Sequence, residues 1–166
     1  MAAHEHHHGH APRSLRIGII TLSDTRTAAT DESGRLIREL VERAGHRVVH
    51  YEIAPDTPEL IERAIAGSLD GVDALIMSGG TGIAPRDSTV EVTRRMLDKE
   101  LEGFGELFRM LSYNEIGAAA FLSRALAGVI RGKIVVALPG SPAGCRLGLE
   151  KLLLPELGHM AHLLGL

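Results

Sequence analysis

Short apolar runs alternate with amphipathic segments along almost the whole chain, and this alternation restricts the fold more than any other feature. Residues 15–22 form a nearly continuous apolar run rich in isoleucine, which is typical of a parallel strand covered on both faces. Residues 31–44 then place apolar side chains at helical spacing, and Gly45 stands where a glycine commonly ends a helix. Together they predict a strand followed by a helix.

The same strand and helix pattern recurs toward the C-terminus. Residues 46–54 predict a second strand, and residues 58–69 predict the helix that follows it. Residues 73–77 and 133–138 predict two further buried strands, and a final helix is expected from about Ser141. This order predicts an α/β domain: a three-layer sandwich with a mostly parallel central sheet and helices on both faces.

The segment between the last two predicted strands is less regular. Residues 88–91, Ser-Thr-Val-Glu, match a capping box and predict the start of a helix. A Gly-Phe-Gly sequence inside residues 99–115 is expected to break any long helix there. Residues 113–126 predict a further helix that ends at Gly128. The side chains expected to face inward from it are Ala118, Ala119, Leu122 and Leu126.

Residues 1–13 differ from the rest of the chain in composition. They contain five of the nine histidines and too little apolar content to fold, so we expect a disordered His-rich tail before one domain at residues 14–166. Clustered imidazoles can bind zinc, nickel or copper, so the tail can serve as a metal buffer or chaperone. The alternatives are a solvated tail or a purification-tag remnant, although Glu5 and Gly9 interrupt the histidines.

Composition and charge exclude several classes of protein. A formal charge of −3 gives no electrostatic footprint for nucleic acid or an anionic membrane. The single cysteine, Cys145, excludes an intramolecular disulfide and fits a reducing compartment. No signal peptide is visible, and the longest apolar stretch, residues 116–130, contains Arg124 and is too short to span a bilayer. We therefore expect a cytoplasmic protein.

The glycine-rich segment after residues 73–77 is the strongest candidate site. Ligands of parallel sheets bind beyond the carboxyl ends of strands. Three glycines within four residues let the backbone present N–H groups to an anion, so an anion cradle is favoured over a plain glycine turn. Arg86 can contact a phosphate, and Asp87 can hold magnesium or a sugar hydroxyl. The cradle comprises Ser78, Gly79, Gly80, Thr81 and Gly82.

Two other predicted strand ends carry polar groups. Ser141 is placed as a helix N-cap with Pro142 in the first turn, where amide groups favour a phosphate; a capped turn without a ligand is the alternative. Asp56 follows the second predicted strand and can cap the next helix. If Asp87 lies beside it, the two carboxylates form a natural magnesium site.

Other familiar motifs are missing. Ile134 follows Gly132-Lys133, so the Gly-Lys-Ser/Thr ending of a P-loop is absent, and no dinucleotide fingerprint follows the first predicted strand. Kinase and dehydrogenase functions are therefore disfavoured. The sequence offers no Ser-His-Asp, Cys-His or His-Glu-x-x-His arrangement, and His159 with His162 fits an ordinary surface pair.

The residues named above resemble a known family. Ser78-Gly-Gly-Thr-Gly followed by Pro85-Arg-Asp87 is similar to the molybdopterin-binding signature of MoaB, MogA and the related domains of gephyrin-type proteins. The similarity extends from residue 15 to about residue 160. Its other motifs lie at residues 19–24, 55–56, 103–108 and 138–142. Residues 112–117 and 123–125 look closer to MoaB than to MogA.

The resemblance implies a molybdopterin-binding fold assembled as a homotrimer or homohexamer. It also implies magnesium-dependent adenylylation of molybdopterin, in which the terminal phosphate of the pterin attacks the α-phosphorus of ATP and pyrophosphate leaves. By resemblance, Asp56 and Asp87 place magnesium and the ATP phosphates, residues 79–82 form the phosphate cradle, and Ser78 and Ser141 lie near the pterin and its phosphate.

Two alternatives to the enzyme stay open. One is a non-catalytic molybdopterin-binding or scaffold protein of the same pathway, with other pathway proteins as partners. The other is a metal chaperone that acts through the His-rich tail.

Overall fold

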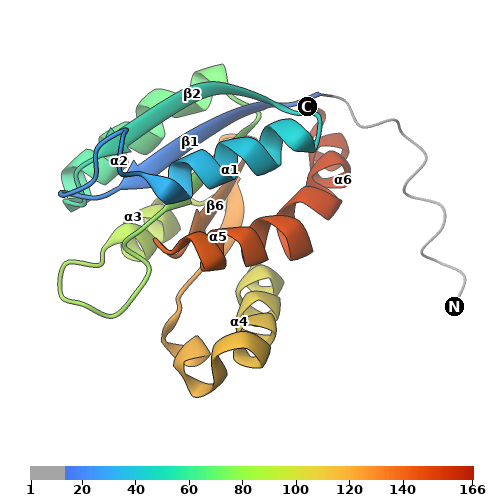
Figure 1. Cartoon of the computed structure of the whole chain (residues 1–166). Coiled ribbons are helices and arrows are strands. Elements are labelled where there is room, and N and C mark those ends of the chain that lie inside the picture. The colour runs from blue at the N-terminus through green and yellow to red at the C-terminus, as the bar shows by residue number, and fades with distance from the viewer. Residues whose placement is uncertain (1–13) are drawn as a thin grey trace, which may run out of the picture.

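The computed structural model describes residues 14–166 and contains one six-stranded sheet between two layers of helices (Figure 1). The strands lie in the order β2-β1-β3-β6-β5-β4. The first four run parallel, β5 is antiparallel to β6, and β4 is antiparallel to β5. The bounds are β1 (Arg16–Leu22), β2 (Arg47–Ala54), β3 (Ala74–Ser78), β4 (Lys99–Glu100), β5 (Leu126–Ile130) and β6 (Lys133–Leu138). The predicted three-layer, mostly parallel architecture is confirmed.

The helices divide between the two faces of the sheet, with α1, α4, α5 and α6 on one face and α2 and α3 on the other. Their bounds are α1 (Glu32–Arg43), α2 (Pro58–Ser68), α3 (Thr89–Met96), α4 (Glu102–Ile116), α5 (Pro142–Gly148) and α6 (Leu154–Leu164). The shorter elements are the 3-10 turns η1 (Leu69–Gly71) and η2 (Gly117–Leu122), and the π-helical turn η3 (Leu149–Leu153) between α5 and α6. No helix within residues 14–166 has the length and apolar content to cross a membrane. The predicted His-rich tail lies outside the described residues.

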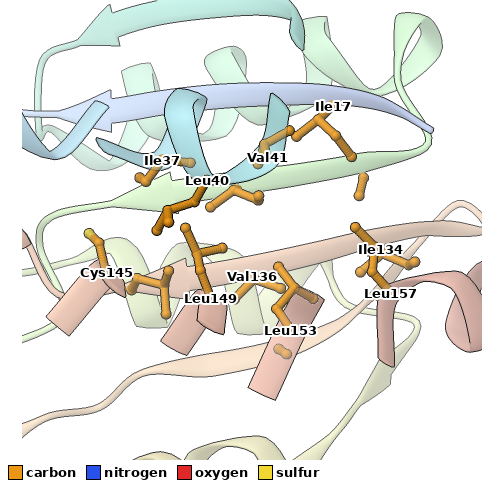
Figure 2. Packing of buried hydrophobic residues seen from close by; sticks show 14 of the residues in the cluster. Ile17, Ile37, Leu40, Val41, Ile134, Val136, Cys145, Leu149, Leu153 and Leu157 are labelled. Carbon is orange, nitrogen blue, oxygen red and sulfur yellow. The ribbon is translucent and has the colours of Figure 1, made fainter. Parts of the chain in front are cut away.

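The core consists of two aliphatic clusters, one on each face of the sheet. Successive residues of a central strand point to opposite faces, so Ile76 joins the cluster under α1, α5 and α6, while Leu75 and Met77 join the cluster under α2 and α3. Figure 2 shows the first cluster, in which side chains of α1 and of the C-terminal helices gather over Ile17 and Val136. Burial on both faces explains why these strands are almost continuously apolar in sequence.

The helix ends that flank the site follow the sequence. The Asp31 side chain caps α1 by accepting a hydrogen bond from the Gly34 N–H at 2.9 Å, and Gly45 follows the helix with φ of +90°. Ser141 caps α5 by accepting from the Gly144 N–H at 3.2 Å, as predicted. The structure therefore confirms the expected helix starts after β1 and after β6.

The helix start predicted at residues 88–91 is confirmed, but the capping box predicted there is wrong. Ser88 stands at the N-cap of α3, but its hydroxyl donates to the Asp56 carbonyl at 3.4 Å and makes no capping bond. The Glu91 carboxylate forms an ion pair with Arg124. Both side chains of the motif therefore bond to residues that are distant in sequence instead of to the backbone at the start of α3.

The prediction for residues 99–115 is also wrong, because α4 runs unbroken through Gly103 and Gly105. A Cβ atom on Gly105 would lie 2.8 Å from the carbonyl oxygen of Ala125. The glycine therefore lets α4 pack closely against the backbone that enters β5, and this packing outweighs its low helix propensity.

The helix predicted over residues 113–126 is wrong as well. The chain leaves α4 at Ile116, forms η2 and enters β5 at Leu126, while Ala118, Ala119 and Leu122 are exposed. Gly128 lies inside β5, where a Cβ atom would overlap the Lys99 carbonyl oxygen. This glycine permits close approach of two strands rather than ending a helix.

Candidate anion-binding site

The candidate site lies at the carboxyl edge of the parallel strands. The chain passes from β1 to β2 on one side and returns to β3 on the other side of β1, so the strand order reverses between β1 and β3. Ligands of doubly wound sheets bind at such a switch point. Thr21 of β1 and Ser78 of β3 pair there, with their hydroxyl oxygens 3.5 Å apart. The loops after β1 and β3 extend to the left in Figure 1.

The glycine loop adopts a conformation that other residues rarely reach. Gly79 and Gly80 have φ of +107° and +66°. The Gly79 N–H donates to the Leu138 carbonyl at 3.0 Å, and the Thr89 hydroxyl donates to the Gly79 carbonyl at 2.8 Å. A Cβ atom on Gly79 would overlap the Leu22 carbonyl oxygen. The loop therefore packs directly on the ends of β1 and β6.

A Gly79→Ala variant is expected to lose about 2–3 kcal/mol of unfolding free energy, because its positive φ and the overlap with Leu22 both add strain. Urea unfolding measures this loss. Gly67→Ala is the matched control, since Gly67 is exposed in α2 and a Cβ atom there meets nothing within 4 Å. We expect it to be as stable as the wild type or slightly more stable. Equal stability of the two variants would contradict the described loop.

Arg124 holds the second half of the loop. Its Nε donates to the Gly82 carbonyl at 2.9 Å and its Nη2 to the Asp87 carbonyl at 3.1 Å. Its backbone N–H donates to the Thr81 carbonyl at 3.1 Å. The ion pair with Glu91 orients the guanidinium and lowers the pKa of that carboxyl. The loop is thus anchored from the connection between η2 and β5, a link that sequence reasoning missed.

Asp56 lies beside a second carboxylate that sequence reasoning did not select. The Asp56 N–H donates to the Asp24 carboxylate at 3.3 Å. Burial raises the pKa of Asp56, and a hydrogen bond between the two side chains and the negative charge of Asp24 raise it further, against the opposing charge of Arg86. Both aspartates stand two residues beyond a parallel strand, and this shared position is the signal that could have identified Asp24.

The structure brings the segment that carries Asp87 next to Asp56, through the hydrogen bond from Ser88. The Asp87 carboxylate itself accepts from the Ala84 N–H at 2.9 Å and closes a turn of the loop. Within residues 14–166, no three acidic, histidine or cysteine side chains gather as a metal centre. The N-cap of α2 is Thr57. Asp56 therefore does not cap that helix, and the magnesium role of the two aspartates stays a prediction.

The turn after β6 forms the other side of the site. Gly140 lies against the glycine loop, since a Cβ atom on it would be 3.5 Å from the Gly79 Cα. Its carbonyl accepts two hydrogen bonds, from the Ser33 hydroxyl and from Arg26 Nη2, each at 2.8 Å. Ser141 follows with an exposed side chain. The predicted cradle and the predicted capped turn are therefore neighbours.

A buried carboxylate, Asp31, supports this turn. Its oxygens accept from the Thr21 hydroxyl at 2.5 Å, the Tyr51 hydroxyl at 2.6 Å and Arg26 Nη1 at 3.3 Å, in addition to the Gly34 N–H. Burial by itself raises the pKa of Asp31, but the hydrogen bonds outweigh it and leave the pKa below the ordinary aspartate value. Sequence reasoning did not select Asp31, because its partners on β1 and β2 give no local signal.

A glycine loop, a capped turn and paired carboxyls at the switch point of a parallel sheet are features of α/β proteins that bind phosphate-bearing ligands. Comparison with known proteins gives the family. Residues 18–159 match the family described as "Probable molybdopterin binding domain". The molybdenum cofactor biosynthesis protein B of Bacillus cereus is 50% identical over 157 residues, which cover 93% of each chain. The Bacillus subtilis protein of the same name is 48% identical over 159 residues, with 94% of each chain covered.

Solved structures agree with the sequence comparison. A crystal structure of a molybdenum cofactor biosynthesis protein B superposes with a TM-score of 0.91 at 50% identity, covering 94% of this chain and 99% of the other. The tungsten cofactor synthesizing protein MoaB from Pyrococcus furiosus gives 0.83 at 38% identity, covering 92% and 98%. The chain therefore belongs to the molybdopterin-binding domain family, among the MoaB-type proteins of molybdenum cofactor biosynthesis.

Proposed function

We propose that this protein binds molybdopterin at the carboxyl edge of its sheet and adenylylates it with Mg-ATP, releasing pyrophosphate. The observation that carries the proposal is the position of the glycine loop between two separate polar groups. The Asp24–Asp56 pair lies on one side, and the turn at Gly140 and Ser141 lies on the other. A reaction between two phosphates needs two such subsites.

The nucleotide side has the donor set that magnesium prefers. The half-buried Asp56 and the exposed Asp24 bring carboxylate oxygens close together, and burial together with the charge of Asp24 raises the pKa of Asp56. Magnesium is usually held by one or two carboxylates together with substrate phosphates, so this small set fits a metal that arrives with ATP. Asp56, with Asp24 beside it, and Asp87 from the neighbouring loop would hold it, and it would neutralise charge on the triphosphate.

The remaining catalytic work is positioning and charge stabilisation. N–H groups of residues 80–82 would donate to phosphate oxygens, since that of Gly79 already donates to the Leu138 carbonyl, and Arg86 would add positive charge near Asp56. The Ser141 oxygen accepts from Gly144, which leaves its hydroxyl hydrogen free to donate to the pterin phosphate. A phosphate oxygen of the pterin then forms a bond to the α-phosphorus of ATP as the bond to the β-phosphate breaks. No covalent protein intermediate is required.

One observation favours the non-catalytic alternative. The Asp87 carboxylate is engaged with the backbone of its own loop, and a permanent structural role would remove it from metal binding. A single experiment separates binding from turnover: molybdopterin is titrated into the protein, and pyrophosphate release is then followed after addition of Mg-ATP. We expect saturable pterin binding followed by pyrophosphate release. Binding without release would leave a scaffold or carrier role, and no binding would refute both functions.

We also propose that the protein assembles as a homotrimer or homohexamer through α4 and η2. Exposed contiguous apolar surface commonly marks an interface. The exposed apolar side chains of this face are Leu107, Met110, Tyr113, Ile116, Phe121 and Leu122. Sedimentation of the wild type is expected to give three or six subunits, and Phe121→Glu is expected to shift the protein toward monomer. A monomeric wild type would contradict this assembly.

A further inference from the structure

We propose that Arg26 is a positioning residue for the pterin-phosphate side of the site, because it fixes the Gly140 carbonyl and with it the turn that carries Ser141. This inference rests on the proposed binding of molybdopterin. It assigns a role to Arg26, a residue of the loop after β1 that the proposed reaction does not otherwise use.

The guanidinium of Arg26 joins parts of the chain that lie far apart in sequence. Its Nη1 donates to the Asp31 carboxylate at 3.3 Å and to the Ser33 hydroxyl at 3.2 Å. Its Nη2 donates to the Gly140 carbonyl at 2.8 Å, 114 residues further along the chain. Ser33 donates to the same carbonyl, so Gly140 is held by two side chains.

The group that orients Arg26 is itself fixed. Asp31 has no exposed surface, and hydroxyls from β1 and β2 hold its Oδ2 atom while the N-terminus of α1 holds Oδ1. An ionised carboxylate accepts hydrogen bonds at both oxygens. Asp31 can therefore accept from Arg26 while it keeps its other hydrogen bonds. The guanidinium therefore has a rigid charged anchor behind it, as precise sites require of their supporting residues.

The turn that Arg26 holds is coupled to the phosphate cradle. A Cβ atom on Gly140 would lie 3.5 Å from the Gly79 Cα, and the Gly79 N–H donates to the Leu138 carbonyl just before the turn. Displacement of this turn would change the position of Ser141 relative to the cradle. Arginine is suited to the task because its planar fork makes bonds in fixed directions to several acceptors, which a lysine ammonium cannot reproduce. Among the described residues, the Arg26 guanidinium makes no hydrogen bond to Asp24 or Asp56, and its backbone N–H donates to the Ser23 hydroxyl at 3.2 Å.

The test measures two ligands separately on Arg26→Gln, with Arg43→Gln as the matched control. The Arg43→Gln substitution removes the same charge, but from an exposed position in the last turn of α1. We expect the Kd of Arg26→Gln for molybdopterin to rise roughly tenfold, the cost of one lost charged hydrogen bond. Its Kd for Mg-ATP should stay within about twofold of wild type, the control should match wild type for both ligands, and Arg26→Lys should fall between.

A merely structural role predicts a different pattern, in which both ligands bind more weakly together as Tm falls. That result, or an unchanged molybdopterin Kd in Arg26→Gln, would overturn the inference. If Arg26→Gln does not fold, Ser33→Ala removes the second donor to Gly140, and an unchanged molybdopterin Kd in that variant would overturn it. Failure of the wild type to bind molybdopterin would instead refute the proposed function, so the two failures are distinguishable.

Discussion

An Asp87→Asn variant is expected to release pyrophosphate about 100-fold more slowly than the wild type when supplied with molybdopterin and Mg-ATP. Asparagine keeps an oxygen that can accept the Ala84 N–H, so the turn of the loop should persist while the negative charge is lost. The expected defect is therefore in metal placement rather than in folding. Steady-state release of pyrophosphate measures it, together with the molybdopterin Kd, which should be unchanged.

Asp98→Asn is the control for this substitution. Its carboxylate also accepts a backbone N–H, that of Arg131 at 2.6 Å, but it lies at the opposite end of α3 from the glycine loop. We expect normal turnover from this variant. Equal rates in Asp87→Asn and the wild type would show that Asp87 is only a loop residue and would remove it from the catalytic set.

An Asp31→Ala variant is expected to lose about 3–5 kcal/mol of unfolding free energy, the largest stability effect that we foresee. The substitution leaves the Thr21 and Tyr51 hydroxyls without their acceptor and Arg26 without its counter-ion. Unsatisfied buried donors each carry a desolvation cost. Denaturant unfolding measures the loss, with Glu32→Ala as an exposed acidic control on the next residue. A loss below 1 kcal/mol would contradict the buried role of Asp31.

The pH dependence of this difference gives an independent check. The folded-state pKa of Asp31 is below the ordinary value, so its ionised form is stabilised by folding. That contribution is fully present above the unfolded aspartate pKa, about 4, and is lost as pH falls through the folded value. The stability gap between the wild type and Asp31→Ala should therefore shrink below about pH 4. A gap that stays constant down to pH 2 would contradict the ionised state of Asp31.

The parallel half of the fold is predictable because its signals are local. Continuous apolar strands, helical periodicity, and caps such as Ser141 all agree with the final structure there. The antiparallel part is not predictable by the same reasoning. In the sequence, Gly105 and Gly128 each predict the end of a helix. In the structure, Gly105 instead allows close approach to the backbone of Ala125, and Gly128 allows close approach to the backbone of Lys99. Only the tertiary contact reveals what these glycines do.

The candidate site divides in the same way. The glycine loop is evident from its closely spaced glycines and its place after a predicted strand. The roles of Arg26 and Asp31, in contrast, depend on partners such as Gly140 and Tyr51 that lie far along the chain. Asp24 is an intermediate case, because its position after β1 repeats that of Asp56 after β2. Sequence reasoning therefore finds groups proposed to contact ligand more readily than the groups that hold them in place.

Transfer of the α-phosphate of ATP to molybdopterin is the most direct test of the proposed reaction. The protein is incubated with molybdopterin, magnesium and ATP labelled at the α-phosphorus, and the products are separated. We predict that label moves to the pterin in a one-to-one ratio with released pyrophosphate, and that omission of magnesium or use of Asp87→Asn suppresses the transfer. Bound molybdopterin with all label remaining in ATP would contradict the adenylylation and leave binding as the function of the site.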